Sequence, residues 1–419
     1  MRVIELYSPH VHSACYSLHV GAGGLSDPPS LPGAALLTQR IVIEAETVAR
    51  RKSAPHGRLC YGGVEAGQAF VLVSGHRSRG DELATLVPKF LAEAEFTEQA
   101  LMREKSRLWD SLPDTSDGWF DTTDLISRLL LGDDVNWGVH GSREAIERIT
   151  VADAVACFSS YWLGSDMVLS AAGSYSRDDL SRCVEQLEEV ASHTQGAVPL
   201  GVGTPVPRSR TALVPVPDDR FSLHLLFPGA RVLEPGSYLL RLLDCIVGGT
   251  PDARVPRRLS WDLGLADASY STVYFVNDRS VLEVYVEGGY ERFHDILRAL
   301  VRSVESLTFE PPSIGEVQEA QTVLTFERDY QLDDPQNAAL SRGSLFFASG
   351  AEDPRAFEEA SIGPGMVTPD GVFETAQRVL SWDNLSVLYV GPEVDEVVDV
   401  VESTWPYKPI EIWGDAAEE

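Results

Sequence analysis

An internal repeat constrains the fold of this chain more than any other feature. Ser17–His19 and Ser222–His224 share the letters SLH, and each ends a strand-like run that leads through a turn into an apolar helix. Near the end of each half, Asp166–Gly173 and Asn384–Gly391 form a second strand-like run, which precedes an acidic helix. Two copies are too few for a solenoid. The matching order of elements therefore predicts two homologous domains.

The segment 197–206 separates the two copies. It is rich in Gly and Pro and has no hydrophobic periodicity, which is typical of a linker. We therefore expect an N-terminal domain over 1–196 and a C-terminal domain over 207–411. Strands and helices come in blocks rather than in strict alternation, which favours an α+β fold. Each domain, of about 200 residues, is expected to be a mostly antiparallel sheet packed with helices.

Hydrophobic periodicity places the elements within each copy. Strands are predicted over 2–7, 13–20, 68–74, 167–172, 212–216, 221–227, 272–276 and 281–286. Helices are predicted over 34–50, 81–93, 97–110, 142–149, 151–162, 176–192, 235–247, 290–306, 313–329 and 370–380. Pro88 lies inside one of these helical patterns and predicts a kink or a later helix start.

Composition excludes several classes of protein. The 419 residues carry a net charge of −29, which argues against a nucleic-acid or anionic-membrane partner. No apolar run approaches the roughly 20 residues that a membrane span needs, and no signal peptide is visible. The five Cys residues are scattered and form no C-x-x-C pair, so we expect reduced thiols. These features predict a cytoplasmic protein.

The segment Gly33–Arg40 carries a family resemblance. It reads GAALLTQR and follows Val20–Gly23 and Asp27-Pro28-Pro29. This lead-in resembles the start of the active site in the pitrilysin/insulinase family of inverzincin peptidases, which includes mitochondrial processing peptidase. In that family the inverted zinc motif H-x-x-E-H comes next. Here Leu36 and Arg40 stand at the two His positions and Gln39 at the Glu position.

Three further segments resemble the same family in the same order. Phe96–Lys105 is similar to the helix that supplies the third zinc ligand, a Glu, which would fall at Asp110 or Ser111. Gly138–Ile146 resembles the G-x-x-x-G-[ST]-x-E-x-I turn, and Gly248–Ala266 resembles the S-R-L…G-L-A-Y segment of the second domain. The resemblance covers nearly the whole chain. It implies two homologous domains that form half of a clamshell, paired with a second subunit around a chamber for unfolded peptides.

The residues at the motif positions cannot perform zinc hydrolysis. Leu36 has no donor atom, Arg40 is permanently charged, and Gln39 cannot accept and return a proton. His10 and His12 form a closely spaced pair elsewhere, but no third ligand lies near them in sequence, and a solvated turn explains them better. We therefore expect no metal and no catalytic residue on this chain. The resemblance places the zinc on a partner subunit.

The resemblance also supplies two candidate substrate-binding residues. Arg254 matches the Arg of S-R-L, which in the family reaches the substrate backbone beside the zinc and is often contributed by the partner subunit. Asp267 stands at the family's Tyr position, and Tyr270 is the candidate replacement. A surface role for Arg254, near Arg257 and Arg258, is about equally compatible with the sequence. For Tyr270, an aromatic ring that packs inward from a strand is the stronger alternative.

The first hypothesis is a non-catalytic, substrate-binding subunit of a heterodimeric zinc peptidase. Its partner is a homologous catalytic subunit with an intact H-x-x-E-H. The substrate is a peptide or a leader segment, and neither nucleic acid nor membrane is a partner. The second hypothesis is a structural pseudo-peptidase scaffold that does not touch substrate, which the departure at Asp267 favours slightly. A hydrolase active on its own is the third.

Overall fold

The chain folds into two compact units, each built around one β-sheet. The computed structural model describes residues 1–50, 58–110, 122–132, 139–164, 167–191, 209–231, 234–276, 279–349, 367–405 and 409–413. The N-terminal unit comprises residues 1–112, 135–204 and 328–354, and the C-terminal unit comprises residues 113–134, 205–327 and 355–419. Neither unit is one continuous stretch of chain. The predicted linker 197–206 lies outside the described residues.

The sheet of the N-terminal unit has five strands in the order β1-β5-β2-β4-β3. β1 runs parallel to β5, and the other neighbours are antiparallel. The strands are β1 (Arg2–Tyr7), β2 (Ser13–Val20), β3 (Arg58–Val64), β4 (Ala69–His76) and β5 (Met167–Gly173). The predicted strands of this half are confirmed, and β3 is an additional edge strand.

The sheet of the C-terminal unit repeats this topology and adds one strand, in the order β11-β6-β10-β7-β9-β8. Its strands are β6 (Thr211–Pro215), β7 (Arg220–Arg231), β8 (Ala268–Val276), β9 (Arg279–Gly289), β10 (Ser386–Gly391) and β11 (Ile410–Ile412). β6 and β10 are parallel, as β1 and β5 are. His19 and His224 both lie on the central strand, between the equivalents of β5 and β4. The internal repeat is therefore a repeat of fold.

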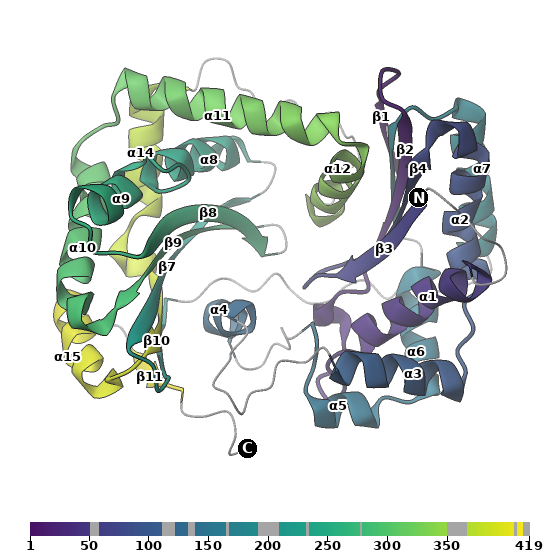
Figure 1. The fold of residues 1–419 in the computed structure, drawn as a ribbon, viewed down its shortest axis with the longest axis horizontal. Coiled ribbons are helices and arrows are strands. Elements are labelled where there is room, and N and C mark those ends of the chain that lie inside the picture. The colour runs from purple at the N-terminus through teal and green to yellow at the C-terminus, as the bar shows by residue number, and fades with distance from the viewer. Residues whose placement is uncertain are drawn as a thin grey trace. The chain divides into compact units, whose positions relative to one another are not determined.

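Helices cover both sheets (Figure 1). In the N-terminal unit they are α1 (Ala34–Arg50), α2 (Gly80–Ala92), α3 (Glu98–Trp109), α5 (Arg143–Arg148), α6 (Val151–Cys157), α7 (Arg177–Ala191) and α12 (Pro335–Ser349). The C-terminal unit contains α4 (Thr122–Leu131), α8 (Pro235–Val247), α9 (Arg254–Pro256), the turn η5 (Arg257–Asp262), α10 (Phe293–Phe309), α14 (Pro369–Val379) and α15 (Val394–Thr404). α11 (Ile314–Asp333) begins in the C-terminal unit and leads into α12.

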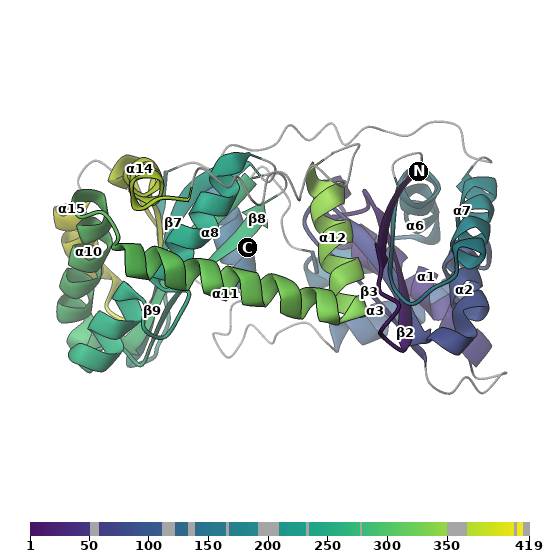
Figure 2. The same cartoon turned by 90° about the horizontal axis from the view of Figure 1, so that it is seen from above.

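Each sheet has one strongly apolar face. Tyr16 and Leu18 of β2 alternate with Ser17 and His19, and they join the buried cluster that includes residues of α2 and α7. α12 lies on the opposite face of the same sheet, where it contacts β2 and β5 (Figures 1 and 2). In the C-terminal unit the main core lies between the sheet and α8, α10 and α14. These layers confirm an α+β fold with two domains.

Two helices come from one half of the chain but pack in the unit formed mainly by the other half. α4 comes from the first half of the chain but contacts β10 of the C-terminal sheet. α12 comes from the second half but covers the N-terminal sheet. α12 can approach that sheet closely at Gly343, because a Cβ added there would lie 2.1 Å from Nε2 of His19.

The remaining expectations concern local features. α2 begins at Gly80 and includes Pro88, so the helix does not start later than predicted. Ser176 caps α7 as expected, because its Oγ accepts a hydrogen bond from the Asp179 amide at 3.0 Å. All five Cys residues are free thiols. Among the described helices, none combines the length and the apolar character that crossing a bilayer requires.

Candidate functional site

The segment that resembles a zinc motif lies in α1, whose first turn is fixed by a buried carboxylate. Asp27 accepts hydrogen bonds from the backbone amides of Gly33 and Ala35, both at 2.7 Å. Burial raises the pKa of Asp27 to about 7, although these amide bonds favour the ionised form. Gly33 has a φ of +92°, and a Cβ there would also collide with the carbonyl of His140, so this position requires glycine. The turn before α5 therefore packs directly against the start of α1.

Apolar side chains surround the first motif position. Leu36 lies in one buried cluster with Leu108 of α3 and Ile146 of α5. Leu36 and Ile146 lie in two of the segments that resemble the zinc peptidases, and Leu108 lies on α3, which contains most of the third. The first ligand position is therefore part of a small hydrophobic core, with no oxygen, nitrogen or sulfur donor from any of the three side chains.

The Glu position of the motif holds a buried amide. Gln39 is only 2% exposed, and its Nε2 finds no hydrogen-bond partner within the described residues. A Cβ added at Gly62 would lie 2.5 Å from this Nε2, so the amide lies against the edge strand β3. An amide cannot shuttle a proton, so Gln39 cannot act as the base that this position supplies in zinc peptidases.

Arginines and carboxylates form a network near Arg40, which stands at the second His position of the motif. Glu44 of α1 pairs with Arg103, and with Arg107 at 3.3 Å; Arg107 also pairs with Glu104. Burial and the nearby Glu44 raise the pKa of Glu104, while Arg107 and Arg40 favour its ionised form. Both carboxylates are therefore already paired with guanidinium groups.

These residues do not fit a zinc ion. Structural and catalytic zinc sites need three or four neutral-imidazole, thiolate or carboxylate donors converging at about 2.0–2.3 Å. The described residues include no group of three or more His, Cys, Asp or Glu side chains placed to hold a metal. Asp110 is the exposed C-cap of α3, and Ser111 lies outside the described residues. A cation at this position would also face the permanent positive charge of Arg40.

Arg254, the first candidate substrate-binding residue, begins α9 and is held by an ion pair. Its Nε and one Nη donate to the two carboxylate oxygens of Glu316, at 2.8 and 3.2 Å. Its other Nη donates to Ser306 Oγ at 3.4 Å. Burial alone would raise the pKa of Glu316, but Arg254 and Ser313 overcome this effect and lower the pKa to about 2. Arg254 is thus oriented by α11 rather than free in solvent.

Tyr270, the second candidate, does not pack inward. It lies on the edge strand β8, is 44% exposed, and stacks on Tyr285 of β9 with ring centroids 4.7 Å apart. Asp267, at the family's Tyr position, instead pairs with Arg220 at 3.0 Å and Arg292 at 3.4 Å. α9 and β8 contact each other in the C-terminal unit, but no contact joins the Arg254 and Tyr270 side chains among those described.

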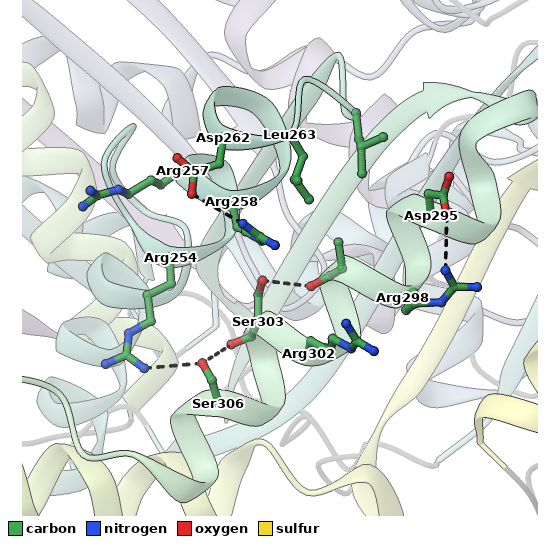
Figure 3. A pocket seen from close by; sticks show the side chains of 12 residues that line it. Arg254, Arg257, Arg258, Asp262, Leu263, Asp295, Arg298, Arg302, Ser303 and Ser306 are labelled. Atoms are coloured by element: carbon green, nitrogen blue, oxygen red, sulfur yellow. Dashed lines mark hydrogen bonds and ion pairs between the residues drawn. The ribbon is translucent and has the colours of Figure 1, made fainter.

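A groove lined by arginines lies beside Arg254 (Figure 3). Its volume is about 670 Å³, and α9, η5 and α10 form its walls. We call it the arginine groove; its lining residues are Arg254, Arg257, Arg258, Asp262, Leu263, Leu265, Asp295, Arg298, Ala299, Arg302, Ser303 and Ser306. The sequence analysis noted Arg257 and Arg258 only as neighbours of Arg254 and predicted the helix that is α10 without singling out its arginines. The four-residue spacing of Arg298 and Arg302, on one side of a helix, was the available signal.

Comparison with known proteins agrees with this fold. Residues 148–324 match the family model of the peptidase M16 inactive domain. The chain is 25% identical over 335 residues to an uncharacterized zinc protease of Mycobacterium tuberculosis, which covers 73% of this chain and 72% of that protein.

Solved structures show the same two-domain architecture at lower sequence identity. A peptidase M16 inactive domain from Pseudomonas fluorescens matches with a TM-score of 0.78 and 16% identity, covering 93% of this chain and 96% of that one. A protease from Helicobacter pylori matches with a TM-score of 0.76 and 12% identity, covering 93% and 97%. A chain of complex III₂ from Candida albicans matches with a TM-score of 0.74 and 14% identity, covering 93% of each.

The family match, the mycobacterial relative and the shared fold agree with the order of segments from Gly33 to Ala266. Residues 148–324 of this chain thus resemble the peptidase M16 inactive domain, and the chain as a whole shares the fold of the M16 structure from Pseudomonas fluorescens.

Proposed function

We propose that this chain is the non-catalytic, substrate-binding subunit of a heterodimeric zinc peptidase. The partner is a homologous subunit with an intact H-x-x-E-H, and it carries the zinc. The pair encloses peptides or leader segments and cleaves them at the partner's metal, in the cytoplasm. This chain contributes surface for the peptide and places Arg254 beside the substrate.

The observation that carries the proposal is the packing of α1. Leu36 is buried against Leu108 and Ile146, and the carboxylates of Glu44 and Glu104 are paired with Arg103 and Arg107. The local backbone of the motif is thus kept, including the cap at Asp27 and the left-handed Gly33. The zinc ligands and the general base of the motif are absent. A chain with this architecture needs another subunit to supply the metal and the base.

The edge of the C-terminal sheet supports a role in peptide binding. β8 pairs only with β9 among the described strands, so one side of its backbone is available for an added strand. Tyr270 presents an exposed ring on this strand. Strand addition relies on backbone hydrogen bonds, and a flat aromatic ring beside it provides contact area without demanding one particular peptide sequence.

The test is a cleavage and metal assay with the subunits alone and together. The chain is co-expressed with the M16 homologue from the same genome that carries H-x-x-E-H. We expect zinc in the partner, none bound by this chain, and peptide cleavage only by the complex. Zinc and cleavage by this chain alone would overturn the proposal, and so would a partner whose cleavage rate is unchanged when this chain is omitted.

The alternative is a structural pseudo-peptidase that scaffolds a complex without touching substrate. Asp267 favours it, because the position of the family's Tyr is occupied by a carboxylate already paired with Arg220. The likeness to a chain of complex III₂ shows that this fold also occurs inside a large assembly. One measurement distinguishes the substrate-binding subunit from the structural scaffold. Crosslinking of a photoreactive peptide to this subunit in the complex supports substrate binding, and its absence in an active complex supports the scaffold.

A further inference from the structure

The arginine groove concentrates positive charge on a strongly acidic protein. The whole chain has 63 Asp and Glu against 34 Lys and Arg, yet the groove is lined by five Arg and only two Asp. Within the described part of the chain, neither lysine nor glutamate lines it. Scattered surface charge does not produce such a local reversal of sign, so the arginines call for an explanation beyond solubility.

The arginines come from two walls of the groove. Arg254 and Arg258 lie four residues apart on the wall formed by α9 and η5, and Arg298 and Arg302 lie four residues apart on α10 (Figure 3). Like charges at this spacing repel each other and destabilise a helical segment. An anion that binds between the walls would relieve this repulsion.

The ion pairs within the groove leave several of its arginines available to bind a ligand. Arg254 is occupied by Glu316, whereas Arg258 reaches Asp262 only at 3.8 Å and Arg298 reaches Asp295 only at 3.4 Å. Arg257 and Arg302 have no carboxylate within 4.0 Å among the described residues. Exposed pairs as long as these are weak, so an incoming carboxylate can replace them.

Apolar side chains at the groove indicate which kind of anion fits. Leu263 and Leu265 line the groove, and Leu263 is 40% exposed. Arg is among the residue types most enriched at the energetic centres of protein interfaces. A bare phosphate would not use these apolar groups. A volume of about 670 Å³ accommodates a few residues of a peptide.

We propose that the arginine groove binds an acidic peptide segment, with Asp or Glu side chains paired to Arg258 and Arg302 and an apolar side chain against Leu263 and Leu265. The guanidinium fork matches a carboxylate in two parallel hydrogen bonds, which gives the site its selectivity for carboxylates over neutral amides. This site needs neither the zinc motif nor a partner subunit, so it stands independently of the function proposed above.

The experiment measures peptide binding to the full chain by fluorescence anisotropy. The probe is a labelled octapeptide of alternating Glu and Leu, and its matched comparison has every Glu replaced by Gln. We expect the Glu peptide to bind at least tenfold more tightly, with an affinity that falls as NaCl rises from 50 to 300 mM. Equal binding of the two peptides, or no binding of the Glu peptide, would overturn the proposal.

Substitutions of the groove's charged residues test whether the peptide binds in the arginine groove. Arg258→Gln with Arg302→Gln removes one charge from each wall and should weaken binding by tenfold or more. Arg241→Gln with Arg378→Gln makes the same change in net charge elsewhere in the C-terminal unit and should stay within twofold of wild type. Conversely, Asp262→Asn with Asp295→Asn removes the internal competitors and should tighten binding. If the first pair binds like wild type, the groove is not the site.

Two further ligands exclude other anions. Inorganic phosphate at 10 mM and an eight-nucleotide oligo-dT are added as competitors to the bound Glu peptide. We expect neither to displace it at an ionic strength matched with NaCl. Displacement by the oligonucleotide at a lower concentration than unlabelled Glu peptide would identify a phosphate site and overturn the assignment to acidic peptides.

Discussion

Arg254 and Glu316 form a two-pronged ion pair that joins the start of α9 to the first turn of α11. The Nε and Nη donors lie 2.8 and 3.2 Å from the two carboxylate oxygens, and Ser313 also donates to Glu316. Glu316 therefore does two things at once: it caps α11 and it fixes the direction of the arginine. Any role of Arg254 toward a peptide depends on this carboxylate.

Glu316→Gln should lower the free energy of unfolding by about 1 kcal/mol at pH 7, because the pair is partly exposed and its strength is screened by solvent. The pKa of Glu316 is lowered to about 2, so its stabilising effect is complete above the ordinary Glu pKa and is lost as the pH falls through 2. Urea unfolding from pH 7 down to pH 2 measures this difference. Glu319→Gln, at an exposed carboxylate on the same helix, is the control and should be nearly neutral at every pH.

Arg254→Ala in the assembled peptidase should reduce kcat/KM for peptide cleavage by roughly 10² if the guanidinium donates to the substrate carbonyl. Arg254→Lys keeps the charge but loses the fork, and it should recover only part of the activity. The unfolding midpoint of each variant is measured in parallel, because Arg254→Ala also leaves Glu316 without its partner. Wild-type cleavage by a folded Arg254→Ala complex would remove the substrate role of Arg254 and favour the scaffold.

Restoring the zinc motif should not restore a zinc site. Leu36→His, Gln39→Glu and Arg40→His together supply two imidazoles and a base, but the first imidazole enters the cluster of Leu108 and Ile146. Burying a polar ring there without a partner costs about 1–3 kcal/mol. The expected result is a less stable protein with no bound zinc and no peptide cleavage. One zinc per chain with cleavage would show that the local scaffold is still competent.

The elements that follow local rules were predictable from sequence, and those made by long-range packing were not. α8 is predicted over 235–247 and observed as Pro235–Val247, because Pro235 at its first turn and Gly248 after its end mark both limits. α12 was missed because half of its buried face is made of the small residues Ala338, Ala339 and Gly343, which weaken the hydrophobic pattern. β3 was missed because Gly62 and Gly63 interrupt its pattern.

The candidate sites also differ in whether local sequence or long-range packing determines them. The loss of the zinc motif follows from three letters, at Leu36, Gln39 and Arg40. The ion pair of Arg254 with Glu316 and the groove between Arg258 and Arg302 join residues 44 or more positions apart, and only the fold brings them together. The assignment of α4 and α12 to opposite units depends on tertiary contacts that no local pattern encodes.

His19 should make the stability of the protein depend on pH in the mildly acidic range. Burial lowers its pKa to about 4, although hydrogen bonds with Gln68 and with the Ala339 backbone favour the charged form. The folded state therefore resists protonation between pH 6.5 and 4, and stability is lost as the pH falls through this window, by an amount on the order of 3 kcal/mol. His19→Asn should remove this part of the pH dependence. His10→Asn, at an exposed imidazole, should leave it unchanged.

Gly343 should be indispensable for the packing of α12. A Cβ at this position would lie 2.1 Å from Nε2 and 2.5 Å from Cδ2 of His19, whose ring is fully buried and cannot move aside. Gly343→Ala should therefore lower the free energy of unfolding by about 1–3 kcal/mol, against the gain that alanine normally brings to a helix. Chemical denaturation measures the loss, and hydrogen exchange of α12 amides should rise with it.

Gly315→Ala is the matched control for Gly343→Ala, because a Cβ at Gly315 of α11 would meet only Ser313 Oγ, at 3.8 Å. The stability of this control should be unchanged or raised by up to about 1 kcal/mol. The source of the clash is tested in a His19→Ala background, where the cost of Gly343→Ala should shrink because the ring is gone. An equal cost in both backgrounds would mean that α12 tolerates no side chain at 343 for a reason other than His19.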